Sequence, residues 1–267
     1  MKTPPIRSLL LLTALLAAWA CSVREDRRPC PCYLTIVLDR AGAQLHGLGM
    51  DSLRVAAAGD GPMLQDASVA TERCPDDLEW QVPKQWVRIA AHAGAKRLQQ
   101  SRDALLIAYG TEADSLFAYS ARVDCNGEAA ADTVRLHKQF ATLSLVVTGP
   151  SEAHPFILEL ESRWAGWDRL DFSPVMGRFR ATATQVDNEQ YRIRLPRQGD
   201  DGLELHAAGW NGEPLKSLPI GKEIAARGYD WFAPDLADIR ITIDFARATV
   251  DVTISDWDNG GSQQYDI

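Results

Sequence analysis

The chain has 267 residues, of which 46% are hydrophobic and 24% charged, and its formal net charge is −8. This acidity argues against binding to nucleic acid, whose phosphates require a basic surface, and against electrostatic binding to a membrane surface. The length exceeds that of one ordinary sandwich domain, so two domains are expected.

Residues 1–20 have the pattern of a bacterial lipoprotein signal peptide. Lys2 and Arg7 precede a mostly apolar run that ends at Ala20 and is shorter than the ~20 apolar residues that span a bilayer. Cys21 follows directly, so processing would leave it as an acylated N-terminus that anchors the chain in a membrane. The alternative is an ordinary secretory signal peptide with an incidental cysteine. Removal of the signal leaves 26 Lys and Arg against 36 Asp and Glu, a net charge of −10.

A short charged segment, residues 21–29, would link the lipid to the first domain, and four cysteines follow it: Cys30, Cys32, Cys74 and Cys125. An even number of cysteines in an exported chain predicts two disulfides. A bridge between Cys30 and Cys32 would be strained, so these two are expected to reach Cys74 and Cys125, in either order. A zinc site is the alternative, but structural zinc favours paired short spacings that Cys74 and Cys125 lack. No metal or other cofactor is predicted.

Alternation of apolar and polar residues predicts β-strands along most of the remaining chain. In the clearest example Ile239, Ile241 and Ile243 share one face of a strand. The predicted strand segments are 33–39, 85–92, 116–123, 142–148, 239–245 and 249–257. Asn-Gly pairs at 126, 211 and 259 mark turns, and only short helices are expected, at 94–104 and 221–228. Many short strands separated by turns predict an all-β fold of sandwich domains.

A polar segment of small residues, 126–132, follows the last cysteine and marks a domain boundary. We therefore expect an N-terminal β-sandwich domain at 30–132 and a C-terminal β-sandwich domain at 133–267.

Three stretches resemble the FimB/Mfa2 family of fimbrial anchor subunits from Bacteroidales. They are CSVREDRRPCPCYLTIVLD at 21–39, DTVRLHKQFATLSLVVTG at 132–149, and the region from LPRQGDD at 195 to WDNG at 257–260. The resemblance implies two transthyretin-like Greek-key β-sandwich domains, a lipid on Cys21 in the outer membrane, and a position at the base of a surface fimbria. It also implies fimbrial stalk or accessory subunits as partners, joined by donor-strand exchange, in which a strand of one subunit completes the sheet of another. The implied role is to tether, and also to terminate, the fimbria.

The sequence carries no catalytic motif, so no enzyme activity is expected. The histidines, at 46, 92, 137, 154 and 206, form no H-E-x-x-H pattern, and neither G-x-S-x-G nor a glycine-rich phosphate loop is present. The acidic cluster at 76–79 is typical of a solvated loop rather than of an acid–base pair.

A glycan-binding surface lipoprotein is the alternative function. Trp164 and Trp167 lie three residues apart and would form a stacking platform for sugar if both rings were exposed. Large aromatic residues more often fill the ends of a sandwich core, and this is the expectation for the pair.

Overall fold

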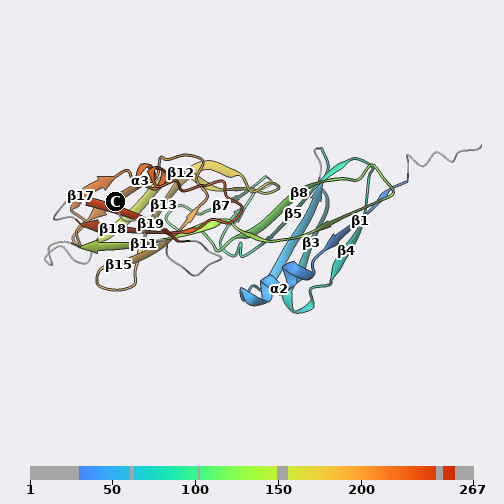
Figure 1. The fold of residues 1–267 in the computed structure, drawn as a ribbon, viewed down its shortest axis with the longest axis horizontal. Helices are drawn as coiled ribbons and strands as arrows, with labels where there is room; N and C mark the ends of the chain where they lie inside the picture. The colour runs from blue at the N-terminus through green and yellow to red at the C-terminus, as the bar shows by residue number, and fades with distance from the viewer. Residues whose placement is uncertain (1–29, 61–62, 102, 149–155, 245–248, 256–267) are drawn as a thin grey trace, which may run out of the picture.

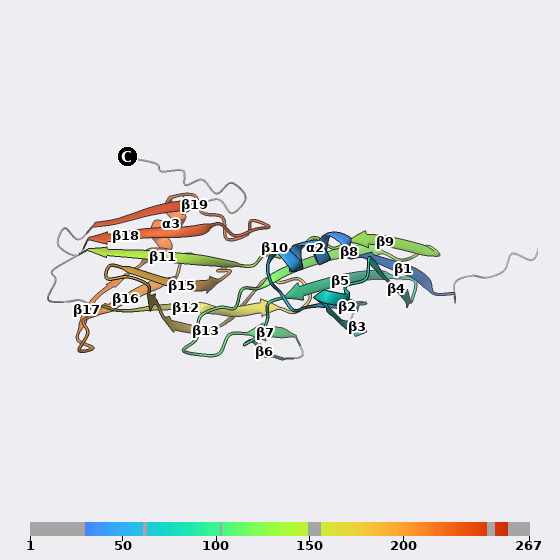
Figure 2. The same ribbon diagram turned by 90° about the horizontal axis from the view of Figure 1, so that it is seen from below.

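The structure is a computed structural model that describes residues 30–60, 63–101, 103–148, 156–244 and 249–255. The predicted signal peptide, Cys21, the remainder of segment 21–29 and the Asn259-Gly260 turn lie outside these residues. Strands dominate, and they form two halves that lie end to end along the long axis of the molecule (Figure 1, Figure 2). The predicted all-β fold is confirmed.

The N-terminal half contains the strands β1 (Cys32–Val37), β2 (Ser52–Ala58), β3 (Met63–Ala70), β4 (Asp77–Val82), β5 (Trp86–Ala93), β8 (Phe117–Asp124), β9 (Ala129–Thr133) and β10 (His137–Lys138). In one sheet β1 is central, antiparallel to β4 and parallel to β9. The other sheet has the order β10-β8-β5-β2-β3, with antiparallel neighbours.

The C-terminal half contains β6 (Gln99–Gln100), β7 (Ala104–Leu106), β11 (Phe140–Thr148), β12 (Ile157–Asp168), β13 (Pro174–Thr182), β14 (Thr184–Gln185), β15 (Gln190–Pro196), β16 (Glu204–Ala208), β17 (Pro214–Leu218), β18 (Asp238–Asp244) and β19 (Thr249–Ser255). One sheet has the order β14-β15-β11-β18-β19. The other has the order β17-β16-β12-β7-β6, and β13 pairs with β12 as well.

Each half buries its own apolar core, because the alternating strands turn their apolar faces inward. The N-terminal core includes Leu34 and Ile36 of β1, both fully buried. The C-terminal core includes Leu143 and Leu145 of β11 and Ile241 of β18, also fully buried. Burial of such side chains is worth about 1.5–3 kcal/mol each, so the strand faces supply much of the folding free energy.

The predicted strand segments are confirmed, because each overlaps one strand of the structure: β1, β5, β8, β11, β18 and β19 in chain order. The predicted inward faces are confirmed too, since Ile239, Ile241 and Ile243 are all buried. The Asn211-Gly212 pair joins β16 to β17 as predicted, and Gly212 has a φ of +82°, which favours glycine.

Two short strands depart from the predicted domain division. Residues 99–106 were expected in the N-terminal domain, but β6 and β7 belong to a sheet of the C-terminal half, where β7 pairs with β12. The approach is close: a Cβ added to Gly166 would lie 2.2 Å from the Leu105 carbonyl oxygen. Alternation shows which face of a strand is buried but not which sheet the strand joins, so the sequence could not reveal this pairing. The domain limits 30–132 and 133–267 stay a prediction.

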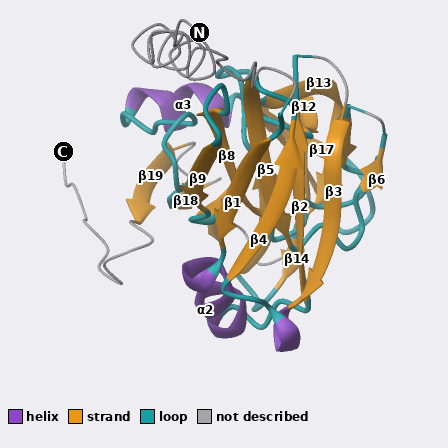
Figure 3. Ribbon diagram, turned by 90° about the vertical axis from the view of Figure 1, so that its right-hand side faces the viewer, coloured by secondary structure: helices purple, strands orange, loops and turns teal. Residues whose placement is uncertain are grey.

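The helices are short. The predicted helix at 221–228 is confirmed by α3 (Ile220–Ala226), whereas the one predicted at 94–104 is wrong, because β6 and the start of β7 occupy that stretch. An unpredicted helix, α2 (Asp39–Gly47), lies at one end of the N-terminal strands (Figure 3) and buries Ala41 and Leu45, four residues apart. Residues 71–73 form a 3-10 turn, η1 (Thr71–Arg73). None of the helices in the described part of the chain is long and apolar enough to cross a membrane.

Candidate functional site

The N-terminal end of β1 is where the expected lipid-bearing segment would join the folded chain. Cys32 is the first residue of β1 and is fully buried, whereas Cys30 is exposed. Figure 1 shows β1 at the end of the molecule remote from the strands of the C-terminal half. A tether attached here would therefore leave the C-terminal half at the far end.

Neither of the two predicted disulfides is present in this structure, in which Cys30, Cys32, Cys74 and Cys125 are free thiols. Cys74 packs beside α2, where a Cβ added to Gly42 would lie 3.4 Å from its Sγ. Cys74 therefore lies beyond the Val37 end of β1. Cys32 is at the opposite end of this strand, and the two ends are about 17 Å apart at ~3.3 Å per residue. A disulfide tolerates at most ~7 Å between Cα atoms, so the structure does not bring Cys74 within reach of Cys30 or Cys32.

Cys125 lies next to Cys32 instead. It directly follows β8, is fully buried, and its backbone N–H donates to the Gln85 carbonyl at 3.0 Å. The Cys125 thiol lies close to that of Cys32, and burial, followed by the proximity of Cys32, raises the pKa of the Cys125 thiol. The structure thus brings together one of the predicted pairs.

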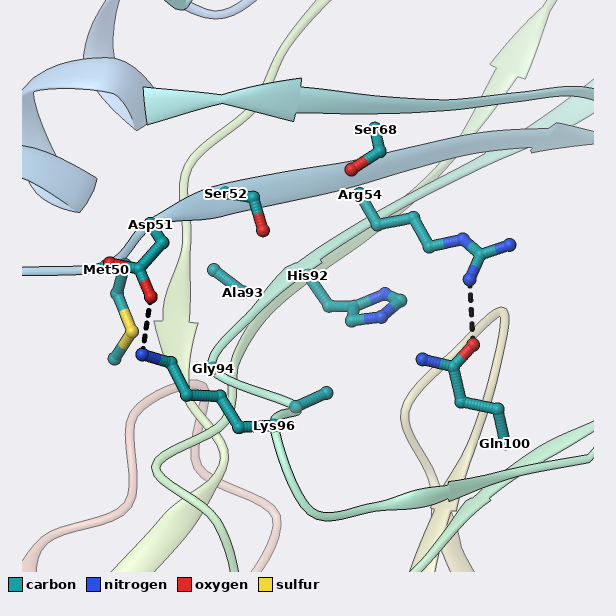
Figure 4. Close-up of a pocket in the computed structure, with 11 residues that line it drawn as sticks. Met50, Asp51, Ser52, Arg54, Ser68, His92, Ala93, Gly94, Lys96 and Gln100 are labelled. Atoms are coloured by element: carbon teal, nitrogen blue, oxygen red, sulfur yellow. Dashed lines mark hydrogen bonds and ion pairs between the residues drawn. The ribbon is translucent and has the colours of Figure 1, made fainter. Parts of the chain in front are cut away.

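A polar pocket of about 390 Å³ opens between β2, β3 and β5 of the N-terminal half and β6 of the C-terminal half (Figure 4). Its lining includes Ser52, Arg54, Ser68, His92, Lys96 and Gln100. Volumes of 300–1,000 Å³ are typical of small-molecule sites. Sequence reasoning missed this site, because its side chains come from segments that only the packing of the two halves brings together.

His92 is the most unusual residue of the pocket. It is 6% exposed, and Figure 4 shows its imidazole pointing into the pocket on the side of Arg54. Burial, followed by the positive charges of Arg54 and Arg169, lowers the pKa of His92 to about 4. The ring is therefore neutral at pH 7, with one nitrogen that donates and one that accepts a hydrogen bond. Within the part of the chain that the structure describes, neither nitrogen has a hydrogen-bond partner.

Ion pairs fix the charged groups around this ring. The Arg54 guanidinium donates to both carboxylate oxygens of Asp66, at 2.9 and 2.7 Å, and to Gln100 Oε1 at 2.7 Å. The hydrogen bond from Arg54 holds the pKa of Asp66 below its ordinary value. Across the pocket, Lys96 Nζ lies 2.5 Å from Asp51 Oδ2. These charged groups are thus paired, and hydrogen-bonding capacity remains with His92 and with the Ser52 and Ser68 hydroxyls.

His92 also contacts the C-terminal half of the molecule. The Phe172 ring meets the imidazole edge-on, with 6.0 Å between ring centroids. Phe172 has a φ of +57°, a left-handed conformation that a bulky residue adopts only where its surroundings impose it. His92 is therefore held from one side by a strained segment of the C-terminal half.

The two tryptophans do not form an exposed platform. Trp167 is fully buried, and its indole N–H donates to the Gln139 carbonyl at 3.1 Å. Trp164 packs against the backbone at Gly199, and its indole nitrogen is buried. The expectation that the pair fills the core is confirmed for Trp167, whereas Trp164 is half-buried and lies outside the buried cluster.

No group of three or more His, Cys, Asp or Glu side chains that could hold a metal ion occurs among the described residues. The expectation that the protein is not an enzyme stays a prediction.

No family model matches the sequence, and no curated protein matches it. Solved structures do share its fold. A Bacteroides thetaiotaomicron protein proposed to bind polysaccharide superposes with a TM-score of 0.62 at 12% identity, over 88% of this chain and 98% of that chain. The fimbrial anchor protein Mfa2 from Porphyromonas gingivalis gives 0.57 at 13% identity, over 87% of this chain and 99% of that chain.

A Bacteroides ovatus protein proposed to be an adhesin gives a TM-score of 0.55 at 12% identity, over 91% of this chain and 97% of that chain. The predicted likeness to fimbrial anchor proteins is thus confirmed at the level of the fold. Identities this low establish a common fold and do not carry function across.

Proposed function

We propose that this protein is a lipid-anchored fimbrial subunit that tethers a surface fimbria at the outer membrane, and terminates it, by donor-strand assembly with stalk subunits. The observation that supports this most is the fold shared with the fimbrial anchor Mfa2, which extends over 87% of this chain and 99% of that chain. The lipid on Cys21 and the fimbrial partners are part of the proposal.

The placement of the two ends suits a tether. The chain enters the fold at β1, at the end of the N-terminal half remote from the C-terminal half (Figure 1). A lipid on the preceding segment would hold this end at the membrane. The C-terminal half would then lie farthest from the membrane, where a fimbrial partner could reach it.

The C-terminal half also presents a sheet edge. Among the described residues, β19 pairs with β18 on one side and ends its sheet on the other. An edge strand leaves backbone N–H and C=O groups that a partner strand can pair with, and alternate side-chain pockets then fix the register. In our proposal β18 and β19 form the scaffold against which the partner strand registers.

Two measurements test this function. We expect the native protein, extracted from outer membranes, to bring fimbrial subunits with it. We also expect cells that lack the gene to shed their fimbriae into the medium, because the lipid tether is gone. Firmly attached fimbriae in the deletion strain would show that the proposal is wrong.

A glycan-binding role is the second candidate, and the pocket around His92 favours it. A neutral, unpartnered imidazole can both donate to and accept from sugar hydroxyls, and Ser52 and Ser68 add hydroxyl groups to the same lining. We expect His92→Ala to abolish retention of the protein on a polysaccharide array, whereas His206→Ala, on β16, leaves it unchanged. If the unaltered protein retains no glycan on the array, this second function is excluded.

A further inference from the structure

Cys32 and Cys125 lie close to each other where the chain enters the N-terminal half, and each lies at the end of a strand in a different sheet of that half. Cys32 begins β1 in one sheet, and Cys125 directly follows β8 in the other. Both belong to one buried apolar cluster, and their thiols lie close to each other. Backbone bonds fix their positions, because Tyr33 N–H donates to the Glu128 carbonyl at 2.9 Å and Cys125 N–H to that of Gln85 at 3.0 Å.

We propose that Cys32 and Cys125 form a disulfide in the exported protein, and that this bond transmits mechanical force from the lipid tether to the C-terminal half. The proposal rests on the tethering function proposed above. The other thiols do not compete for this pairing in the folded chain. Cys30 is exposed outside β1, and Cys74 lies beside α2 at the opposite end of the strand.

The oxidation is a thiol–disulfide exchange with a disulfide-bearing oxidoreductase of the cell envelope. One cysteine thiolate attacks the disulfide of the oxidant, which releases one oxidant thiol and forms a mixed disulfide. The second cysteine thiolate then attacks the sulfur of the first cysteine and releases the other oxidant thiol. Two electrons pass to the oxidant, and its two sulfurs take up the two protons that the cysteines lose.

The reaction must occur before the core closes. Only the thiolate is nucleophilic, and burial raises the pKa of Cys125 in the folded chain. Oxidation therefore takes place on the partly folded chain during export, and the packed core then excludes reductants from the bond.

The position of the bond determines which part of the chain carries force. Without it, a pull on the N-terminal end of β1 is resisted only by the packing of β1 and its hydrogen bonds to β4 and β9. With it, the pull passes from Cys32 to Cys125 and along β9 and β10 to β11, in the C-terminal half. The loop of about 90 residues between the two cysteines carries no force.

Disulfide mapping tests the pair directly. The mature protein, isolated from membranes, is alkylated without reduction, digested with trypsin and analysed by mass spectrometry. Cys30 and Cys32 fall in one tryptic peptide, because no Lys or Arg separates them. We therefore expect the Cys30→Ser variant to keep the link to the Cys125 peptide and the Cys32→Ser variant to lose it. Alkylated Cys32 and Cys125, or a link from Cys125 to Cys74, would overturn the proposal.

Single-molecule pulling tests the force path on the chain from residue 22 to 267, held by peptide tags at both ends. We expect the fully extended oxidised chain to be shorter by about 300 Å, at ~3.3–3.6 Å per residue, than the same chain with a reductant. The Cys125→Ser and Cys125→Ala variants should extend to the longer length without reductant. Equal lengths with and without reductant would overturn the proposal.

A flow experiment in cells tests the mechanical role. We expect Cys125→Ser cells to display the protein at normal levels but to shed fimbriae at lower flow than cells with the unaltered protein. Equal shedding, with the disulfide present only in the unaltered protein, would overturn the mechanical role. The disulfide map is read from the protein alone, so it decides the pairing whether or not the deletion strain sheds its fimbriae.

Discussion

Lys138 Nζ lies 2.6 Å from Asp238 Oδ1, and the Lys138 side chain is fully buried. Lys138 belongs to β10 in a sheet of the N-terminal half, and Asp238 begins β18 in a sheet of the C-terminal half. The same carboxylate oxygen accepts the Thr142 N–H at 2.7 Å. One ion pair thus connects the two halves where the chain passes from one to the other.

Neighbouring contacts reinforce this junction. Asp235 accepts the Lys138 backbone N–H at 2.7 Å and lies 2.8 Å from His137 Nδ1. Arg197, which is buried, donates to Gln139 Oε1 and to the Ala233 carbonyl. Burial lowers the pKa of Lys138, and the hydrogen bond from its ammonium to Asp238 opposes that effect. The junction therefore depends on Asp238 to keep a buried charge compensated.

We expect Asp238→Ala to lower the free energy of unfolding by about 3–5 kcal/mol, because it leaves a buried ammonium and the Thr142 N–H without this partner. Urea unfolding at pH 7 measures the change. Asp251→Ala is the matched control, since its side chain is 70% exposed and its ion pair with Arg227 should contribute at most about 1 kcal/mol. Equal losses in the two variants would contradict the role of the buried pair.

The lowered pKa of His92 predicts that the protein loses stability in acid. Its pKa is about 4 in the folded chain, against an ordinary value of 6.5. Between these values the unfolded chain binds a proton that the folded chain does not, so the free energy of unfolding falls as the pH drops from 6.5 to 4. At about 1.4 kcal/mol per pH unit, the full effect is on the order of 3 kcal/mol.

We expect His92→Gln to reduce the pH dependence of urea unfolding between pH 6.5 and 4 by this amount. His206→Gln, which changes a histidine on β16 far from the pocket, serves as the control. If the free energy of unfolding depends on pH equally in the His92→Gln variant and in the unaltered protein, the His92 imidazole is protonated in the folded protein as readily as in the unfolded chain.

Substitution of Gly166 by alanine tests the unexpected pairing of β7 with β12. A methyl group there would lie 2.2 Å from the Leu105 carbonyl oxygen, so Gly166→Ala must push β7 away. We expect a loss of roughly 3 kcal/mol in urea unfolding, and faster hydrogen exchange of the β7 amides than in the unaltered protein. Gly127→Ala, whose added Cβ would have its nearest neighbour at 3.6 Å, should leave both measurements nearly unchanged.

The proposed lipid predicts a specific labelling result. Cys21→Ala should abolish incorporation of a clickable fatty acid and release the protein in soluble form, because the acylated residue is lost. Cys30→Ala, nine residues farther along the chain, should keep both the label and the membrane attachment. Undiminished labelling of the Cys21 variant would rule out this anchor.

The C-terminal tail tests the donor-strand part of the proposal. Deletion of residues 259–267, which lie outside the described residues, spares both β18 and β19. If the tail donates a strand, the truncated protein should fold and reach the membrane but leave fimbriae shed into the medium. Firm attachment with the truncated protein would assign the strand exchange to another segment, and the circular dichroism spectrum checks that the fold is intact.

The sequence by itself determined the fold class and the faces of the main strands. Ile239, Ile241 and Ile243 recur with a period of two, and an extended strand turns such residues to one side, so their burial follows from the backbone geometry. A helix was missed at 39–47, although the spacing of Ala41 and Leu45 carries the signal, because the strand pattern before it was extended too far.

Only the tertiary structure decided which distant residues meet. Cys32 could have paired with Cys74 or Cys125, and the choice depends on which ends of β1, β4 and β8 lie together. Arg54, His92 and Gln100 share a pocket because β6 crosses to the sheet of the other half. Periodicity describes each strand separately, whereas these contacts depend on the pairing of strands far apart in the chain. That pairing is fixed by the summed packing of both halves, which no local pattern encodes.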